Sequence, residues 1–338
     1  MSKPRIVICP ALPIKMRYTE WWPKLFTEKI TEVAGGSYDV ICAPYGLGNI
    51  CDGKFESNDT FFKRLCEWDW MIIKFLLALN LRNEDIVLLL DCTTSGLLSA
   101  MFQTYKPCKV VGFCHGTSFN TLDIFPPTRQ SFDGSCLEAL DLVLVASRYH
   151  LGKLSDTPYS CDLSNMMALP DNPHLDNIGV VKPMMERPNR VCIVDRDCEQ
   201  KRNKKVIAEV QKTFQVEDIH GKYNTWEDYY RALSNDFRFM LVTTNEETYG
   251  YQVHDALRCG CIPIVPHKFS FPETVPAQYM YDSYFMDPNT QTPHSPMQRM
   301  NNINAHFEVV HSRLNEKPVI EFWSNLWYLL IHGGNYAN

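Results

Sequence analysis

The chain has 338 residues, of which 45% are hydrophobic and 21% are charged, proportions that exclude collagen, a coiled coil or a largely disordered protein. Its 33 Lys and Arg residues against 39 Asp and Glu residues give a net charge of -6, which excludes a generally basic nucleic-acid binder but allows a local basic groove. At about 100–200 residues per domain, the length predicts about two domains.

The cysteines and the start of the chain predict where the protein works. Extracellular disulfide frameworks belong mostly to short, loop-rich chains, so 13 cysteines in a chain of this length indicate free thiols in a reducing compartment. Residues 1–13 lack the apolar core of a signal peptide, and the most apolar internal run, residues 70–81, contains Lys74 and is too short to span a bilayer. We therefore expect a soluble, cytoplasmic protein that does not associate with a membrane.

Short apolar runs alternate with helical segments through the first half of the chain. The clearest run, residues 85–91, is continuously apolar between two Asp residues, which is typical of a strand in a parallel sheet covered on both faces. This alternation predicts βαβ units and a doubly wound sheet. The expected strands are residues 5–9, 38–42, 85–91, 109–114 and 140–146, and the expected helices are residues 21–33, 61–79 and 95–103.

A stretch rich in Pro, Asn, Asp and Ser, residues 159–177, breaks this rhythm, and we expect it to form a long loop. A second α/β series follows, so a domain boundary is expected near residues 180–190, with ligand bound between two α/β halves. The strands expected in this series are residues 191–194, 237–243 and 261–265, and the helices are residues 204–214, 226–234 and 252–258.

Residues 243–260 combine the end of a strand, a glycine and the start of a helix. Gly250 at the junction permits an unusual backbone angle and the close approach of a ligand, and the helix N-terminus offers N–H groups to an anion. Glu247 lies just before the turn and Asp255 lies about one turn inside the helix, so the two carboxylates can bind hydroxyls of a sugar and a ribose. The alternative is that Glu247 only stabilises the helix dipole and that Asp255 is a solvated helix residue.

The loop after the first strand of the second half is rich in charge. Arg196 and Lys201 lie there, at the carboxyl end of a strand, where open α/β sheets bind their ligands. An Arg fork and a Lys point charge together suit a diphosphate. The alternative is a solvated charge run, which is what we expect of Arg202, Lys204 and Lys205.

Together these residues resemble the retaining glycosyltransferases of the GT-B fold, of the glycosyltransferase 4-like type. That family carries an E-x7-E element after a strand of its C-terminal domain, and this chain has Glu247 followed by Asp255 at that spacing. The family also carries an Arg and a Lys five residues apart after the first strand of the domain, and here these are Arg196 and Lys201. Asp in place of Glu at position 255 shortens the reach of the carboxylate by one methylene.

Within that type, residues 190–282 are similar to the tRNA-queuosine mannosyltransferase family. The most specific likeness is a Cys-Gly-Cys-x-Pro segment followed by a Pro-Glu pair. The residues that carry it are Gly221, Tyr229, Tyr230, Leu233, Tyr249, Gly250, Ala256, Cys259, Gly260, Cys261, Pro263, Pro266, Phe271, Pro272, Glu273, Pro276, Ala277, Tyr279, Met280 and Tyr281.

The resemblance implies an architecture and a co-substrate. It implies an N-terminal Rossmann-like acceptor domain at residues 1–185, a nucleotide-sugar domain of the same kind at residues 186–317, and a helix within residues 318–338 that packs back on the first domain. The donor would be a UDP- or GDP-sugar, and no metal or other cofactor would be required. Cys259 and Cys261 are too few and too close together for a zinc site.

The resemblance also implies roles for single residues. Arg196 and Lys201 would hold the donor diphosphate, and Asp255 would hold the ribose. Glu247 would hold the donor sugar together with the backbone of its neighbours. Those neighbours in the donor site are Thr248, Tyr249 and Gly250.

Polar residues that follow the strands of the first half are the candidates for the acceptor side. His115 and Gly116 follow one strand and Asp91 follows another, so all three are expected at the carboxyl end of the sheet. The queuosine family carries a His followed by Glu-Asn-Gln, whereas His115 is followed by Gly-Thr-Ser; the alternative is a His that caps the next segment. Lys15 and Arg17 make the first loop basic, and they would contact nucleic-acid phosphate or be solvated.

Three aromatic residues follow that basic loop. Tyr18, Trp21 and Trp22 are able to stack on a base, but we expect them to pack in the core of the helix instead.

The function expected is transfer of a hexosyl or pentosyl group with retention, and His115, Arg196, Lys201 and Glu247 are the expected catalytic residues. No carboxylate nucleophile is assigned, so stabilisation of the leaving diphosphate carries the rate. Because the first half departs from the queuosine family, we expect another hydroxyl on a modified nucleobase as acceptor, a hydroxymethylated pyrimidine in DNA, as in virus-encoded enzymes, before tRNA queuosine.

Other functions remain open at this stage. The acceptor is alternatively a glycan or a small molecule. The chain is alternatively a nucleotide-sugar-binding protein without activity, or an enzyme that hydrolyses or epimerises its donor. The pattern leaves the oligomeric state open.

Overall fold

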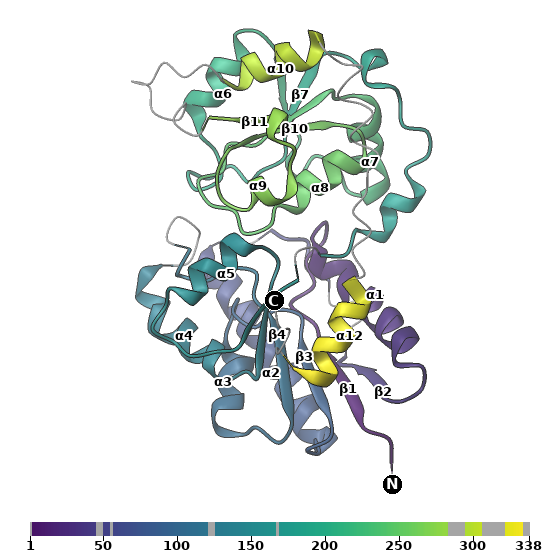
Figure 1. Ribbon diagram of the computed structural model, residues 1–338, viewed down its shortest axis with the longest axis vertical. Helices are drawn as coiled ribbons and strands as arrows, with labels where there is room; N and C mark the ends of the chain where they lie inside the picture. Colours follow the sequence, from purple (N-terminus) through teal and green to yellow (C-terminus); the bar gives the residue numbers. More distant parts are fainter. Residues whose placement is uncertain are drawn as a thin grey trace. The chain divides into compact units, whose positions relative to one another are not determined.

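The computed structural model describes residues 2–44, 50–54, 57–120, 126–166, 169–282, 295–305 and 322–333. The chain divides into two compact units, each built on its own parallel sheet (Figure 1). The first unit comprises Met1–Thr121, Phe125–Pro170 and Ile320–Asn338, and the second comprises Leu122–Ile124 and Asp171–Val319. Among the described residues, none of the helices combines the length and the apolar character that a membrane span requires.

The first unit is built on a six-stranded sheet with the order β2-β1-β3-β4-β5-β6, in which every pairing is parallel. The inner strands β3 and β5 consist of apolar residues that are all buried, as continuous apolar runs predict for a sheet covered on both faces. The order reverses between β1 and β3, the position at which such sheets bind ligands. The strands are β1 (Arg5–Cys9), β2 (Asp39–Cys42), β3 (Ile86–Leu89), β4 (Lys109–Phe113), β5 (Leu142–Val145) and β6 (Leu163–Asn165).

Local capping sets where several helices of this unit begin. The Ser57 hydroxyl accepts the N–H of Thr60 at the start of α2, and the Ser147 hydroxyl accepts the N–H of His150 at the start of α5. Trp21 and Trp22 of α1 are buried, so these rings pack in the core as expected. The helices are α1 (Tyr18–Ala34), α2 (Asn58–Leu79), α3 (Leu97–Thr104), α4 (Gln130–Glu138), α5 (Arg148–Ser155) and α12 (Phe322–His332).

The last helix, α12, belongs to the first unit although it comes at the end of the chain. Its Trp323 ring lies edge-on to Phe26 of α1, with 5.0 Å between the ring centroids. The Lys109 ammonium, at the start of β4, donates to the carbonyls of Leu329 at 3.1 Å and Leu330 at 2.6 Å. A cation at the last carbonyls of a helix satisfies groups that have no partner within the helix.

The second unit is built on a five-stranded parallel sheet with the order β11-β10-β9-β7-β8. Its core gathers the buried faces of β7, β9 and β10 around Tyr230 and Phe271. The strands are β7 (Arg190–Ile193), β8 (Gln215–Asp218), β9 (Phe239–Leu241), β10 (Ile262–Pro266) and β11 (Met280–Tyr281), and the helices are α6 (Lys204–Gln211), α7 (Trp226–Asn235), α8 (Tyr251–Arg258), α9 (Phe271–Thr274) and α10 (Pro296–Ala305).

Three strands of the structure are absent from the sequence prediction: β6, β8 and the two-residue strand β11. Strand β6 lies inside residues 159–177, which were expected to form a loop, so that expectation is wrong in part. Strand β8 was not predicted at all. Strands β6 and β8 are edge strands with one neighbour, and none of their residues is buried, so neither has the apolar run that signals an inner strand. Strand β11 is also an edge strand, and its two buried residues are too few to form a recognisable run.

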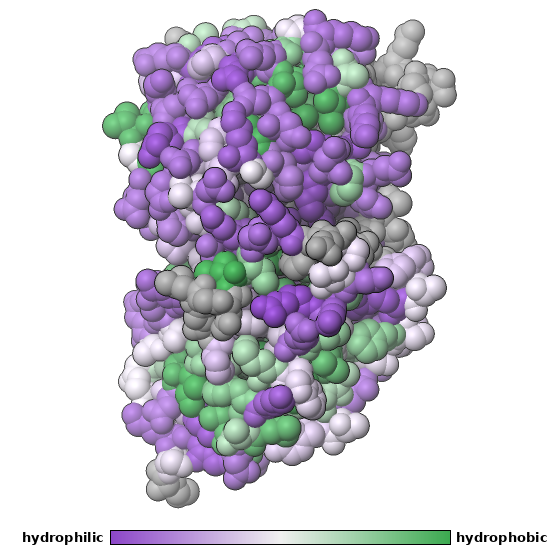
Figure 2. All heavy atoms as spheres, turned by 180° about the vertical axis from the view of Figure 1, so that it is seen from behind, coloured by the Kyte–Doolittle hydropathy of each residue, from purple (hydrophilic) through white to green (hydrophobic). Residues whose placement is uncertain are grey.

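The outer faces of the two units differ in polarity. In the view of Figure 2 the surface of the second unit is mostly hydrophilic, and the first unit presents more hydrophobic area. Trp70 and Leu77, both on α2 of the first unit, are more than half exposed.

Candidate active site

The strongest cluster of predicted residues lies in the second unit, where the chain passes from β9 to α8. The Lys201 ammonium donates to the carbonyl of Glu246 at 2.8 Å and lies 3.5 Å from Oε2 of Glu247. The other oxygen of Glu247, Oε1, accepts the N–H groups of Thr248 at 3.1 Å and Tyr249 at 3.4 Å. The structure therefore brings together Lys201 and Glu247, which lie 46 residues apart in the chain.

Glu247 is held in its ionised form. Burial opposes ionisation, but Lys201, the N–H of Tyr249 and the side chain of Gln252 outweigh burial and hold the pKa of Glu247 below its ordinary value. Its side chain is 15% exposed. A carboxylate that is fixed and charged in this way is a hydrogen-bond acceptor suited to ligand hydroxyls.

Gly250 shapes the backbone at the N-terminus of α8. It is the N-cap residue and has left-handed backbone angles, with φ 84° and ψ 61°. A Cβ atom at this position would lie 3.1 Å from Cε1 of Phe271 and 3.4 Å from Cγ of Glu247. Only glycine adopts this angle without strain, so the sequence prediction of a special backbone angle here is confirmed.

We expect Gly250→Ala to destabilise the second unit by about 1–3 kcal/mol, because left-handed strain adds to the contact with Phe271. The matched control is Gly221→Ala, since Gly221 has φ 64° and nothing within 4 Å of the added Cβ. Urea unfolding measures both variants. Equal losses of stability in the two variants would show that the contact with Phe271 contributes nothing.

Asp255 is a buried residue of α8 and not a solvated one, so the second of the two interpretations of this residue is wrong. Its side chain accepts the hydroxyl of Tyr230 at 3.2 Å, and the residue is 7% exposed. Burial raises the pKa of Asp255 to about 8. The carboxyl group is therefore largely protonated at neutral pH, a state in which it is able to donate as well as accept a hydrogen bond. The ribose contact stays a prediction.

The loop between β7 and α6 carries the other predicted donor residues. Lys201 is buried beside Glu247, and Arg196 is half-buried five residues earlier. Lys204 and Lys205 are exposed, as expected of a solvated run.

Arg202, in contrast, is buried, so its assignment to the solvated run is wrong. Its guanidinium donates from Nε to the carbonyl of Asp195 at 2.9 Å. It also donates to both carboxylate oxygens of Asp218 on β8, at 2.6 and 2.9 Å. This bidentate pair ties the loop to the edge strand.

Two further residues of this cluster have no counterpart in the sequence prediction. Asp195 lies two residues after the end of β7 and is 7% exposed, and its Oδ1 atom accepts the side-chain amide of Gln252 at 3.2 Å. Burial, followed by the negative charge of Glu247, raises the pKa of Asp195 to about 7. Its place after a strand is the one signal in the sequence that points to it.

In the first unit, His115 is held by main chain and by aromatic rings. Its Nε2 atom lies 2.9 Å from the carbonyl of Leu90, which makes that nitrogen the donor. The ring centroid lies 4.6 Å from that of Tyr18 and 5.0 Å from that of Trp22. His115 follows β4, at the carboxyl end of the sheet, and is half-buried. Its contact with substrate stays a prediction.

Asp91 holds the turn that follows β3. Its Oδ1 atom accepts the N–H groups of Thr93 and Thr94, both at 3.0 Å, and Oδ2 contacts the Thr94 hydroxyl. An Asp that accepts from the backbone two and three residues on stabilises a tight turn. Three hydrogen bonds of the Asp91 carboxylate therefore go to residues of its own loop.

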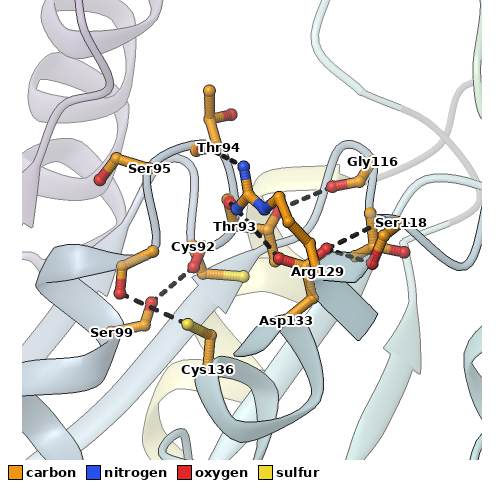
Figure 3. A network of polar contacts seen from close by, with 12 residues as sticks. Cys92, Thr93, Thr94, Ser95, Ser99, Gly116, Ser118, Arg129, Asp133 and Cys136 are labelled. Carbon is orange, nitrogen blue, oxygen red and sulfur yellow. Dashed lines mark hydrogen bonds and ion pairs between the residues drawn. The ribbon is translucent and has the colours of Figure 1, made fainter. Parts of the chain in front are cut away.

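An arginine that the sequence analysis did not single out fastens the same loop. Arg129 donates to the carbonyls of Thr93 at 3.0 Å and Thr94 at 3.3 Å, and to Asp133 at 3.0 Å (Figure 3). Asp133 also accepts the N–H and the hydroxyl of Ser118, at 2.8 and 2.7 Å.

Gly116 belongs to this network as well. Its carbonyl accepts the hydroxyl of Thr93 at 2.8 Å, which joins the loop after β3 to the loop after β4 (Figure 3). Two loops at the carboxyl edge of the sheet are thereby locked to each other, and a rigid edge of this kind is suited to positioning a substrate.

Lys15 and Arg17 lie in the loop between β1 and α1, and both side chains are exposed. The loop is anchored where the N–H of Lys15 donates to the carbonyl of Cys51 at 2.8 Å. Because β1, β3 and β4 are parallel, Lys15 and Arg17 lie at the same edge of the sheet as Asp91 and His115.

In the described part of the chain, no three His, Cys, Asp or Glu side chains come together as metal ligands would.

The fold has clear structural relatives, although no protein-family model matches the sequence. It is similar to sucrose-phosphate synthase from Thermosynechococcus elongatus, with a TM-score of 0.61 and 11% identity over 97% of this chain and 95% of that one. It is also similar to an alpha,alpha-trehalose-phosphate synthase (UDP-forming) from Burkholderia vietnamiensis, with a TM-score of 0.59 and 10% identity over 96% and 98% of the two chains.

A third similar structure is the trehalose-6-phosphate protein from E. coli bound with UDP-2-fluoro glucose. Its TM-score is 0.52, with 11% identity over 96% of this chain and 98% of that one. Identities this low establish the fold alone. The α/β fold predicted from the sequence, of the GT-B type, is confirmed.

Proposed function

We propose that this protein is a retaining glycosyltransferase that binds a nucleotide-sugar donor at the carboxyl edge of the sheet of the second unit. The observation that carries the proposal is the pairing of Lys201 with Glu247 beside Gly250, at the N-terminus of α8. A cation, an ionised carboxylate and a helix N-terminus are the groups that a sugar linked to a diphosphate needs.

Each part of the donor has a matching group. Lys201 and Arg196 supply positive charge for the diphosphate, and the N–H groups at the start of α8 add to it. Glu247 accepts hydrogen bonds from hydroxyls of the sugar. Asp255 would hold the ribose. The solved structures of this fold support a UDP-linked donor, since one is described as UDP-forming and another holds UDP-2-fluoro glucose.

The chemical step follows from the charges of the site. Breaking the bond to the anomeric carbon leaves a diphosphate with one more negative charge, and Lys201 with Arg196 would stabilise that charge. The departing phosphate oxygen would then take the proton of the acceptor hydroxyl, and the acceptor oxygen would form the new bond to the anomeric carbon. A trehalose-6-phosphate synthase of this fold, with a TM-score of 0.55 and 11% identity, is described in terms of transfer with retention, which supports the same outcome here.

For the acceptor we propose a hydroxyl compound that carries phosphate. Lys15 and Arg17 support this, because they expose two cations at the carboxyl edge of the first sheet, where His115 also lies. The resemblance of the sequence favours a hydroxymethylated pyrimidine in DNA, and tRNA queuosine after it. The names of the similar solved structures favour a sugar phosphate instead, and none of those names includes a nucleic acid.

The test offers labelled UDP- and GDP-sugars with hydroxymethylated DNA, tRNA, glucose 6-phosphate or no acceptor, and mass spectrometry locates the label. We expect transfer to one acceptor, and a loss of about 100-fold or more in Glu247→Gln. The exposed Glu199, changed to Gln, is the matched control. Donor hydrolysis or epimerisation without acceptor, or donor binding without turnover, would contradict the transferase.

A further inference from the structure

Asp195 places a second carboxyl group beside Glu247, and the donor chemistry described above gives it no role. One of its oxygens, Oδ1, accepts the Gln252 amide at 3.2 Å. The other, Oδ2, is buried and has no hydrogen-bond partner among the described residues. The side chain of Gln252 also lowers the pKa of Glu247, so it lies close to both carboxyl groups.

An ionised Asp195 would oppose the binding of an anion. A diphosphate would add negative charge to a site that already holds Glu247 and Asp195, and the cations that face them are Lys201, Arg196 and Arg202. Arg202 is already paired with Asp218. A proton on Asp195 removes one of these negative charges and also gives the buried carboxyl group an uncharged form, which burial favours.

The surroundings of Asp195 set the direction of its titration. Burial and the charge of Glu247 raise its pKa to about 7, against the opposing effect of Lys201, Arg202 and Arg196. Tyr281 of β11 also faces it, and burial followed by the charge of Asp195 raises the pKa of that hydroxyl far above neutrality, so Tyr281 stays uncharged. A nearby anion also favours the protonated form of this carboxyl group.

We propose that Asp195 is a positioning residue that takes up a proton when the donor diphosphate binds, so that Glu247 stays ionised for the sugar while the site accepts the added negative charge. The proposal rests on the proposed function. The proton comes from solvent and converts the Asp195 carboxylate into the carboxylic acid, and no covalent bond of the donor changes in this step.

Proton uptake makes donor affinity depend on pH. Below about pH 6 Asp195 is already protonated in the free protein, so binding takes up little. Above pH 7 the uptake approaches one proton and the affinity falls. If only the protonated form binds donor, the dissociation constant is about tenfold larger at pH 8 than at pH 6.

The experiment is calorimetric titration of the full chain with UDP-glucose at pH 7.5 in buffers of different ionisation enthalpy. UDP-glucose is the probe because its diphosphate has no group that titrates near neutral pH. We expect uptake of roughly 0.5–1 proton by the unchanged protein. Asp195→Asn should lose most of this uptake, and its affinity should change much less between pH 6 and pH 8 than that of the unchanged protein, with Asp255, whose pKa is about 8, accounting for any change that remains.

The matched control is Asp197→Asn, because Asp197 lies two residues later in the same loop and is exposed, and it should behave as the unchanged protein. Asp195→Ala serves as a second variant if the Asn variant unfolds. Two results would overturn this inference and leave the proposed function standing. One is binding of UDP-glucose to the unchanged protein without proton uptake, and the other is undiminished uptake in both Asp195 variants. Failure to bind UDP-glucose and GDP-glucose at all would overturn both.

Discussion

Replacing Lys201 by Met should lower kcat/KM for sugar transfer by about 100-fold or more, because the site loses the buried cation that lies beside Glu247 and that we propose to hold the donor diphosphate. Methionine keeps most of the side-chain volume, so the packing changes little. Loss of the charge also removes the main favourable influence on the ionised form of Glu247, whose pKa should rise.

Steady-state kinetics measure two effects of Lys201 separately. Rates with limiting donor give kcat/KM, which includes donor binding, and rates with excess donor give kcat. We expect weaker donor binding together with a slower chemical step, since the leaving diphosphate gains charge in the transition state. Lys204→Met and Lys205→Met are the matched controls, because both side chains are exposed on the neighbouring turn of α6. Activity of Lys201→Met within about threefold of the unchanged protein, roughly 0.6 kcal/mol of barrier, would contradict the role given to Lys201.

The second large effect concerns stability, and it arises at Arg187. This buried guanidinium has main-chain carbonyls for acceptors: those of Lys182 at 2.9 Å, Leu233 at 3.1 Å, Phe237 at 3.3 Å and Cys259 at 3.0 Å. Three of these carbonyls, those of Leu233, Phe237 and Cys259, lie at the C-terminal ends of α7 and α8, so the side chain joins these two helices.

We expect Arg187→Met to destabilise the second unit by about 3–5 kcal/mol, because several buried carbonyls lose their donor at once. Differential scanning calorimetry should show a lower unfolding temperature for that unit. The control is Arg231→Met on α7, whose side chain is exposed and pairs with Asp228, a contact worth less than about 1 kcal/mol. If Arg187→Met unfolds at the same temperature as Arg231→Met, the contacts of Arg187 with the carbonyls contribute little to stability.

The sequence predicted the inner strands of both sheets because burial on two faces demands continuous apolar runs. It did not predict β8, whose four residues are Gln, Val, Glu and Asp. That omission has a consequence for the site, since Asp218 of β8 is the partner of Arg202. Because β8 was not predicted, Asp218 was not recognised as a hydrogen-bond acceptor for Arg202, and Arg202 was expected to be exposed to solvent.

The sequence singled out residues of the candidate donor site but not their environments. The positions after a strand and before a helix identified Glu247, Gly250 and Lys201, because topology places such residues at one edge of a parallel sheet. Asp195 lies against residues that are distant in the chain, among them Gln252 of α8 and Tyr281 of β11, and no local pattern encodes that packing. Burial is also what sets the ionisation of Asp195, so its proton chemistry is visible only in three dimensions.

On the acceptor side, the sequence located residues but not their partners. Asp91 was expected to face a ligand, yet Thr93 and Thr94 occupy Oδ1 and fix the turn. Arg129, which fastens the same turn, lies 36 residues away from Thr93, so the contact depends on tertiary structure alone. Residues of this kind are better candidates for holding the loops in place than for touching an acceptor.

The central claim, sugar transfer with retention from a nucleotide-sugar donor, is tested most directly by the stereochemistry of the product. A UDP-sugar with an α-linkage and an isotope label at its anomeric carbon is incubated with the protein and the acceptor that takes up label, and NMR reads the anomeric configuration. We expect an α-linked product formed together with one equivalent of UDP. A β-linked product, or free labelled sugar alone, would contradict it.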